Sequence, residues 1–362
     1  MPQVSPHRGA AAGLVAAVLF GLSTPVAKWL LPATGPFLMA GLLYLGAGVG
    51  LSLLAPLRKP GREASLERQD LPTLTGMVVA GGIAGPLLLL FGLARLPGAQ
   101  ASLLMNLEAP LTIGLAVLVF GDSLSPREAL GALVIVAGGA LLSVGPGTGS
   151  AQVVGALAVA GACAAWALDN NLGQRLALRD PVAVTRVKTL AAGTVNVCLA
   201  LAVGERLPPP LALAGMVATG FLGYGLSIVL HLLAMRHVGA ARQAAWFATA
   251  PFVGAVASVP LLGERLGVTE LGAGGLMAAG AILLIGARHD HRHGHDAVEH
   301  DHAHVHDAHH VHEHEGMVEE PHAHHHVHAP LVHDHPHLPD VHHRHRHGSR
   351  LVAPGRLRTK GP

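Results

Sequence analysis

The chain has few charged and few aromatic residues: only 13% of its 362 residues are Asp, Glu, Lys or Arg, and 3% are Phe, Trp or Tyr. Soluble domains carry about 25% charged residues. Hydrophobic residues make up 51% of the chain, and the mean hydropathy is +0.46. This composition excludes an ordinary soluble globular domain and favours an integral membrane protein.

Cysteine and recognisable catalytic motifs are also scarce. The two cysteines, Cys163 and Cys198, form no CxxC and indicate no redox compartment. The sequence contains no Walker loop, no dinucleotide-binding motif and no nucleophile triad, which argues against ATP as the driving force and against chemical catalysis. We expect no nucleic-acid partner.

Apolar sequence is abundant, in runs of about twenty residues, which is enough to cross a hydrocarbon core of about 30 Å. We predict about ten membrane spans from these runs. They cover residues 10–31, 36–57, 71–94, 99–120, 127–144, 155–176, 183–203, 211–235, 240–262 and 268–286. A cleaved signal peptide would also explain the first run, because Arg8 precedes it. Recurrence of the same segment in mid-chain argues against that alternative.

The second half of the body repeats the first. Arg95, Gly98, Ala99 and Pro110 are matched at one constant offset by Arg236, Gly239, Ala240 and Pro251. After a one-residue difference, Gly121, Asp122, Ser123 and Leu124 are matched by Gly263, Glu264, Arg265 and Leu266. Five spans in each copy force the second copy to be inverted in the bilayer, as in secondary transporters with a substrate site near the midplane. We therefore predict two repeats, 9–146 and 152–288, and a tail, 289–362.

The distribution of positive charge predicts the orientation in the plasma (inner) membrane. With a cytoplasmic N-terminus, the inside loops hold Arg8, Arg58, Lys59, Arg62, Arg68, Arg127, Arg175, Arg179, Arg236, Arg242 and Arg288. The outside then holds Lys28, Arg95, Arg206 and Arg265. An even number of spans places the C-terminal tail in the cytoplasm as well.

Residues 94–142 and 235–284 resemble the two EamA domains of the drug/metabolite transporter superfamily, in which a proline in mid-helix is followed by a Gly-Glu turn and a glycine-rich helix. The resemblance covers 13–286. Asp122 departs from the usual Glu, and Phe20-Gly21 stands where many members have Trp-Gly. The family resemblance implies an all-α membrane protein of two inverted five-helix repeats that transports a small solute. It does not indicate which solute. A homodimer is left open.

The repeated motifs also predict local structure. Ser125 to Glu128 forms a capping box with Pro126 at the first helical position. Asp122 and Glu264 are interpreted as loop or cap groups in preference to transport carboxylates. Pro110 and Pro251 each remove a backbone donor within a span, which allows either a packing kink or a hinge beside the cavity.

Polar residues within spans are the candidates for transport, because burial in hydrocarbon is costly. They are Lys28, Asn106, Glu108, Asp169, Asn170, Asn171, Arg186, Lys188, Asn196 and His231. Lys28 and Asp169 are either interfacial anchors or transport groups. Superposition of the repeats places Lys28 opposite Asn170, which suggests gates or rims on the two sides of the membrane. Arg186 and Lys188 are interpreted as determinants of topology.

Glu108 is the strongest single candidate. A carboxyl group buried in a span can accept a proton and couple transport to the proton gradient, although it can also pair with a lysine or a helix end. His231 is a second candidate for carrying protons or binding ligand, with a structural hydrogen bond as the favoured alternative. Trp166 and Trp246 are interpreted as packing residues that could instead line the path.

The tail has a different composition, with 24 of the 27 histidines between His289 and His347. Such a segment cannot bury a core, so we predict disorder without metal. Imidazole suits zinc, nickel, copper and cobalt. The candidate ligands are His289, His291, His293, His295, His302, His304, His306, His322, His324, His326 and His328. Drift without function, or a role in pH-dependent solubility, is the alternative.

Three hypotheses for function follow. In the first, the body moves a small metabolite or amino-acid-like solute, and the tail senses or buffers metal. In the second, the body exports a transition metal such as nickel, cobalt or zinc that the tail collects. In the third, the tail is a metal store or sensor tethered to the membrane. Sparse soft ligands within the spans favour the first, and no resident cofactor is required.

Overall fold

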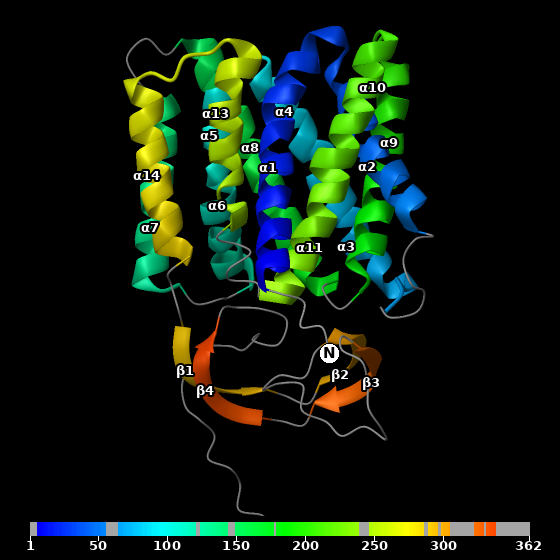
Figure 1. The fold of residues 1–362 in the computed structure, drawn as a ribbon, viewed down its shortest axis with the longest axis vertical. Coiled ribbons are helices and arrows are strands. Elements are labelled where there is room, and N and C mark those ends of the chain that lie inside the picture. The colour runs from blue at the N-terminus through cyan, green and yellow to red at the C-terminus, as the bar shows by residue number, and fades with distance from the viewer. Residues whose placement is uncertain are drawn as a thin grey trace, which may run out of the picture.

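The computed structural model describes residues 6–55, 64–120, 124–143, 149–176, 179–238, 246–285, 289–295, 298–304, 322–328 and 331–337. Its body is an upright bundle of helices (Figure 1). Within these ranges, nine helical stretches are long and apolar enough to cross a membrane, and Ala250–Leu262 is a shorter apolar helix. The protein is a multi-pass membrane protein, as its composition predicts.

The first repeat comprises five spans. Their elements are α1 (Pro6–Leu30), η1 (Leu31–Ala33) and α2 (Pro36–Leu54), then η3 (Arg68–Asp70), α3 (Leu71–Met77), η4 (Val78–Ala84) and α4 (Gly85–Leu93), then α5 (Gly98–Leu104), η5 (Met105–Leu107), α6 (Glu108–Leu115) and η6 (Ala116–Phe120), and finally α7 (Pro126–Ser143).

The second repeat has the same order of spans. Its elements are α8 (Ser150–Gly173), η7 (Gln174–Leu176), α9 (Pro181–Ala202), α10 (Pro210–Thr219), η8 (Gly220–Leu226), α11 (Ser227–Val238), α13 (Ala250–Leu262) and α14 (Val268–Ile285). Most predicted bounds are within a few residues of these. Of the predicted span 240–262, residues 240–245 lie outside the described ranges, and helix α13 covers its second part.

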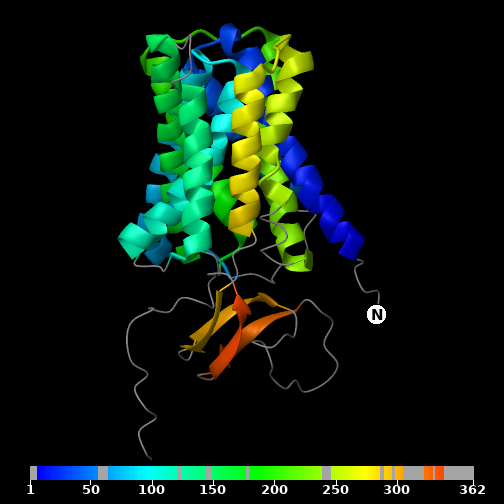
Figure 2. The same ribbon diagram turned by 90° about the vertical axis from the view of Figure 1, so that its left-hand side faces the viewer.

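The two repeats are related by an inversion. Helix α1 and its counterpart α8 run in opposite directions across the bundle (Figure 1). Helix α1 packs against α11 and α13 of the second repeat, while α8 packs against α4 and α6 of the first. Equivalent helices of the two repeats also pack in pairs: α2 lies beside α9 (Figure 1), and α7 lies beside α14 (Figure 2). This arrangement is the predicted inverted five-helix repeat.

We call the end of the bundle where α7 begins and α14 ends the tail side, and the opposite end the far side. At the tail side, the predicted capping box of α7 is confirmed. The Ser125 backbone N–H donates to Glu128 Oε2 at 2.9 Å, and the Glu128 backbone N–H donates to Ser125 Oγ at 3.2 Å. Helix α7 begins at Pro126, the first residue after this cap.

Glycine allows the close approach of α2 to the second repeat. A Cβ atom at Gly46 would lie 2.3 Å from the carbonyl oxygen of Val217, and one at Gly220 would lie 1.9 Å from that of Leu43. By contrast, a Cβ atom added at Gly272 or Gly275, in the glycine-rich stretch of the last span, would meet no atom closer than 3.9 Å. In α14 it is Gly280 that faces Gly131 of α7. Close packing of α14 therefore depends on Gly280 and not on Gly272 or Gly275.

We expect Gly220→Ala to destabilise the protein by about 1–3 kcal/mol or more, because the new methyl group would meet backbone atoms of Leu43 that cannot rotate away. The measurement is thermal unfolding of the purified protein in detergent. Gly275→Ala is the matched control, since nothing lies within 4 Å of its added methyl group. Equal unfolding temperatures for the two variants would contradict the close packing of α2 against η8.

Four segments of the tail are strands. Strand β1 (His289–His295) pairs antiparallel with β4 (Leu331–His337), and β2 (Val298–His304) pairs with β3 (His322–His328). The predicted disorder does not describe these four segments. Histidine alternates with other residues in much of each of them, which is the period-two pattern of a strand. The remaining tail residues, His306 among them, lie outside the described ranges.

Candidate functional site

A cavity of about 540 Å³ lies between the two repeats. It extends from Phe20 and Asn106, near the middle of the bundle, to Glu128 and Ile285 at the tail side. Helices of both repeats line it, among them α1, α6 and α7 of the first and α8, α11, α13 and α14 of the second. Its polar lining residues are Asn106, Glu108, Thr112, Glu128, Asn170, Gln174 and His231. A small-molecule site between inverted repeats is the arrangement expected of a secondary transporter.

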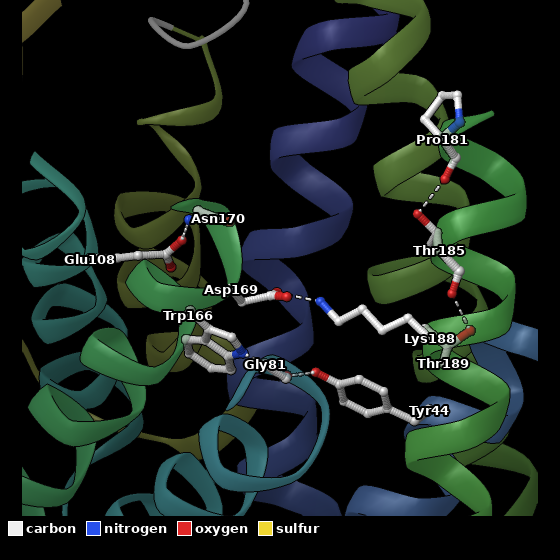
Figure 3. Close-up of polar contacts among 10 residues, drawn as sticks. All are labelled: Tyr44, Gly81, Glu108, Trp166, Asp169, Asn170, Pro181, Thr185, Lys188 and Thr189. Carbon is white, nitrogen blue, oxygen red and sulfur yellow. Dashed lines mark hydrogen bonds and ion pairs between the residues drawn. The ribbon is translucent and has the colours of Figure 1, made fainter. Parts of the chain in front are cut away.

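Glu108 lies in the wall of this cavity and is half-buried. Its Oε1 accepts a hydrogen bond of 2.7 Å from Asn170 Nδ2 on α8 (Figure 3). Glu108 is the first residue of α6, directly after the 3-10 turn η5. The structure thus brings together two of the predicted candidates, one from each repeat.

The prolines of the repeat mark breaks in the fourth and ninth spans. Pro110 lies in the first turn of α6, after η5, and Pro251 lies in the first turn of α13, after a turn at Ala248 and Thr249. Proline is tolerated there because the first turn has no intrahelical acceptor for its missing N–H. Pro251 lines the cavity, whereas Pro110 is buried. The hinge role of both residues stays a prediction.

Two more predicted candidates line the cavity. Asn106 Nδ2 donates to the Leu103 carbonyl oxygen at 2.9 Å and lies 3.8 Å from the sulfur of Met277. The His231 ring contacts the Phe247 ring edge to face, with 4.6 Å between their centroids. The described lining includes neither Trp166 nor Trp246, which agrees with their interpretation as packing residues.

Asp169 points away from the cavity, although it neighbours Asn170 in the chain. Its Oδ2 pairs with Lys188 Nζ on α9 (Figure 3). The side chains of Asp169 and Lys188 are 9% and 16% exposed, and Asp169 Oδ1 is buried without a hydrogen-bond partner. Lys188 was interpreted as a determinant of topology, yet in the structure it is the counter-ion of a buried carboxylate.

The carbonyl groups of the π-helical segment η4 lie beside this ion pair. Gly81 accepts hydrogen bonds from Tyr44 Oη at 2.6 Å and from Trp166 Nε1 at 3.1 Å (Figure 3), and Gly82 accepts one from Asn196 Nδ2 at 3.0 Å. A π-helix leaves carbonyl groups without their usual intrahelical partners, and such segments are frequent at functional sites. The equivalent span of the second repeat contains the π-helical segment η8.

The remaining candidates lie away from the cavity. Asn171 Nδ2 donates to the carbonyl oxygens of Ala167 at 2.8 Å and Thr112 at 3.2 Å, so it joins α8 to α6. Lys28 Nζ donates to the carbonyl oxygen of Leu93, where α4 ends at the far side. A cation stabilises a helix C-terminus. Lys28 therefore joins two helices of the first repeat.

Two carboxylates of the second repeat cap helices of the first at the far side. Glu264 accepts the backbone N–H groups of Gly98 at 2.6 Å and Ala99 at 2.8 Å, where α5 begins. Glu205 accepts that of Leu38 at 2.7 Å, where α2 begins. The interpretation of Glu264 as a cap is confirmed, whereas Asp122 lies outside the described residues. These anionic caps hold the two repeats together opposite the cavity mouth.

A different contact links the repeats at the tail side. Arg179, which precedes α9, pairs with Glu67 at 2.6 Å and with Asp70 at 2.8 Å. The hydrogen bond with Glu67 is the main cause of the raised pKa of the Arg179 guanidinium, and Asp70 adds to it. The loops before α3 and α10 are equivalent in the two repeats. Each therefore supplies carboxylates to the start of the other repeat's second helix, on opposite sides of the bundle.

The candidate metal ligands are described only through the backbone of the tail. The strand register places His291 opposite His335 and His302 opposite His324. Among the side chains that the structure describes, no group of three or more His, Cys, Asp or Glu residues is arranged to hold a metal. Cys163 and Cys198 are both free.

Comparison with known proteins agrees with this geometry. Residues 7–144 and again 153–286 match the EamA-like transporter family. The chain belongs to this family. It is 28% identical over 288 residues to an uncharacterized transporter of Methanothermobacter thermautotrophicus, with 75% of this chain and 84% of that relative covered. It is 27% identical over 259 residues to the uncharacterized inner membrane transporter YedA of Escherichia coli, covering 69% and 81%. A solved crystal structure has a TM-score of 0.56 at 22% identity over 77% of this chain and 96% of that one, which supports the fold.

Several residues of this EamA-family chain were not among the candidates. Phe20 and Phe247 line the cavity, Tyr44 binds the π-helical segment, and Glu205 caps α2. The isolated charges of Asp169 and Lys188 on consecutive apolar spans could have indicated their pairing. No comparable signal exists for Glu205, because a loop carboxylate ordinarily contacts water.

Proposed function

We propose that the protein is a secondary transporter that moves a small organic solute through the Glu108 cavity by alternating access, in the direction of export. The observation that carries the proposal is the cavity itself, which is lined by both repeats and reaches the tail side, while Glu264 and Glu205 cap helices at the far side. We propose that Glu108 exchanges a proton during this cycle. No step of chemical catalysis is part of the proposal.

Transport of a transition metal is the second candidate. The histidine-rich tail favours it, and the register that places His291 opposite His335 supports metal binding there. The polar groups of the described cavity lining are mainly amides and carboxylates, with His231 as the one imidazole. This lining favours an organic solute, because nickel, cobalt and zinc prefer nitrogen or sulfur ligands in sets of three or more.

Growth of a deletion strain on a panel of metal salts beside a panel of metabolites and amino acids tests the two candidates. We expect sensitivity to one or more organic solutes, and relief of that sensitivity by the plasmid-borne gene. Sensitivity to metals alone, relieved by the full chain, would support metal efflux instead. A membrane-tethered metal store would leave growth on the metabolite and amino-acid panel unchanged.

We expect the tail to bind metal and the body to transport without it. The full chain should bind several zinc or nickel ions at about pH 7.5 and release most of them near pH 5, because imidazole with an unperturbed pKa of about 6.5 binds metal only when neutral. A chain truncated after Arg288 should insert normally and lose this binding. Basal solute flux in metal-free buffer should be unchanged, and calorimetry without metal binding at pH 7.5 would refute the role of the tail.

The topology predicts that the tail side is cytoplasmic. A reporter fused after Arg288 should lie in the cytoplasm, and one inserted within 145–152 should lie outside the cell membrane. The reason is that the positive charges concentrate on the inside loops. Alkaline phosphatase and a fluorescent protein are suitable paired reporters. An external C-terminus would contradict both the orientation and the even number of spans.

A further inference from the structure

Among lysine, arginine and carboxylate side chains, those in the described lining of the cavity carry charge of one sign. Its described lining includes the carboxylates Glu108 and Glu128 and no lysine or arginine. Three cationic side chains outside the lining already have partners. Lys28 binds the Leu93 carbonyl group, and Lys188 binds Asp169. Arg179 binds Glu67 and Asp70. The described cavity wall therefore offers negative charge and hydrogen-bonding groups to an occupant.

The two carboxylates differ in how far they are engaged. Glu128 Oε2 accepts hydrogen bonds from the backbone N–H and the hydroxyl group of Ser125 at the tail-side mouth. Glu108 lies deeper and accepts from Asn170 Nδ2, which is a neutral donor. A neutral donor leaves the charge of a carboxylate unbalanced, and an unbalanced charge away from water is costly. A cationic group of the occupant would offset that cost.

The remainder of the wall is largely apolar. Phe20 and Phe247 lie with their ring centroids 5.1 Å apart, and Ile113, Ile135 and Leu284 complete much of the surface. Aromatic faces attract cations as well as apolar groups. The volume of about 540 Å³ lies in the range of sites for small organic molecules.

We infer that the cavity selects a solute with an amine or another cationic nitrogen on an apolar body, with Glu108 as the charge partner and the rings of Phe20 and Phe247 against the apolar part. This inference rests on the proposed function, because it assumes that the cavity is the substrate site. It narrows the organic solutes to amines, and it disfavours anions such as phosphorylated metabolites, for which the described wall offers no cation.

Four probes of similar size and different charge test the inference. They are phenethylamine, a cation at neutral pH; phenylalanine, a zwitterion; 2-phenylethanol, which is neutral; and 3-phenylpropionate, an anion. Equilibrium dialysis of radiolabelled phenethylamine against the full chain in detergent measures binding, and the other three probes serve as competitors. We expect phenethylamine to bind, and each competitor to be at least about tenfold weaker, equivalent to about 1.4 kcal/mol.

Variants assign the preference to Glu108. Glu108→Gln should weaken phenethylamine binding at least about tenfold and remove the difference between phenethylamine and 2-phenylethanol. Glu270→Gln is the matched control, because this carboxylate caps the Gly267 N–H at 2.9 Å outside the cavity. It should bind phenethylamine as the unaltered chain does.

Three outcomes would overturn the inference: no phenethylamine binding, equal competition by 3-phenylpropionate or phenylalanine, or unchanged binding in Glu108→Gln. The proposed function would survive each of them if vesicles containing the protein still moved another solute in a Glu108-dependent manner. Failure of every solute to move, despite binding of phenethylamine, would instead refute transport and leave the site assigned.

Discussion

Glu108→Gln is expected to reduce gradient-driven transport by about 100-fold or more, which is the lower range for loss of a positioned proton-transfer group. Glutamine retains the shape and a hydrogen-bond acceptor for Asn170 Nδ2 but cannot exchange a proton. The measurement is uptake or efflux in vesicles with an imposed proton gradient, using a solute identified by the growth panel. Counterflow without a gradient should persist in the variant at saturating solute, because alternating access itself does not need proton exchange.

The control for this experiment is Glu270→Gln, which changes a carboxylate in the first turn of α14 outside the cavity and should transport normally. Thermal unfolding in detergent should show that Glu108→Gln folds. A variant with unchanged pH dependence of transport would remove Glu108 from the coupling step. His231 and Asp169 would then be the remaining candidates, of which only His231 lines the described cavity.

Lys188→Met is expected to destabilise the protein by about 3–5 kcal/mol, because it leaves the buried carboxylate of Asp169 without its counter-ion. Asp169 Oδ1 already lacks a hydrogen-bond partner, so the carboxylate has no alternative contact in the structure to replace the lysine. Thermal unfolding of the purified protein in detergent measures the loss. A reduced yield of inserted protein should accompany it.

The double variant Asp169→Asn with Lys188→Met separates loss of the ion pair from loss of packing. Removing both charges should recover most of the lost stability, since a buried ion pair is often replaceable by neutral groups. Arg186→Met is the matched control on the same helix. If Arg186→Met destabilised the protein as much as Lys188→Met, the ion pair would not be the cause. The longer apolar run at the tail-side end of α9 would then explain the effect.

Because the chain folds in a bilayer, much of its fold can be predicted from the sequence. Each span must satisfy its own backbone hydrogen bonds and expose apolar side chains, so runs of about twenty apolar residues identify helices directly. The predicted spans 36–57 and 268–286 correspond to α2 (Pro36–Leu54) and α14 (Val268–Ile285). The recurrence of Gly98 and Pro110 as Gly239 and Pro251 predicted the repeat, and an odd number of spans dictated its inversion.

The residues of the candidate site could be predicted from the sequence only in part. Rarity of polar residues within spans singled out Asn106, Glu108 and Asn170, which line the cavity, because the cost of burying such groups restricts them to cavities or partners. The same rule could not separate Asn170 from its neighbour Asp169. These residues are consecutive on α8, and the direction each faces depends on which helices pack around it.

The sequence by itself determined the membrane location, the succession of apolar spans, their inverted repetition and the breaks before Pro110 and Pro251. Each of these depends on local composition or on spacing along one chain. Only the tertiary structure decided that Glu108 meets Asn170 in a cavity, that Lys188 balances Asp169 behind it, and that Glu264 caps α5. Each of these contacts joins different helices. Their partners are set by how the helices pack across the interface, which side-chain identity alone does not specify.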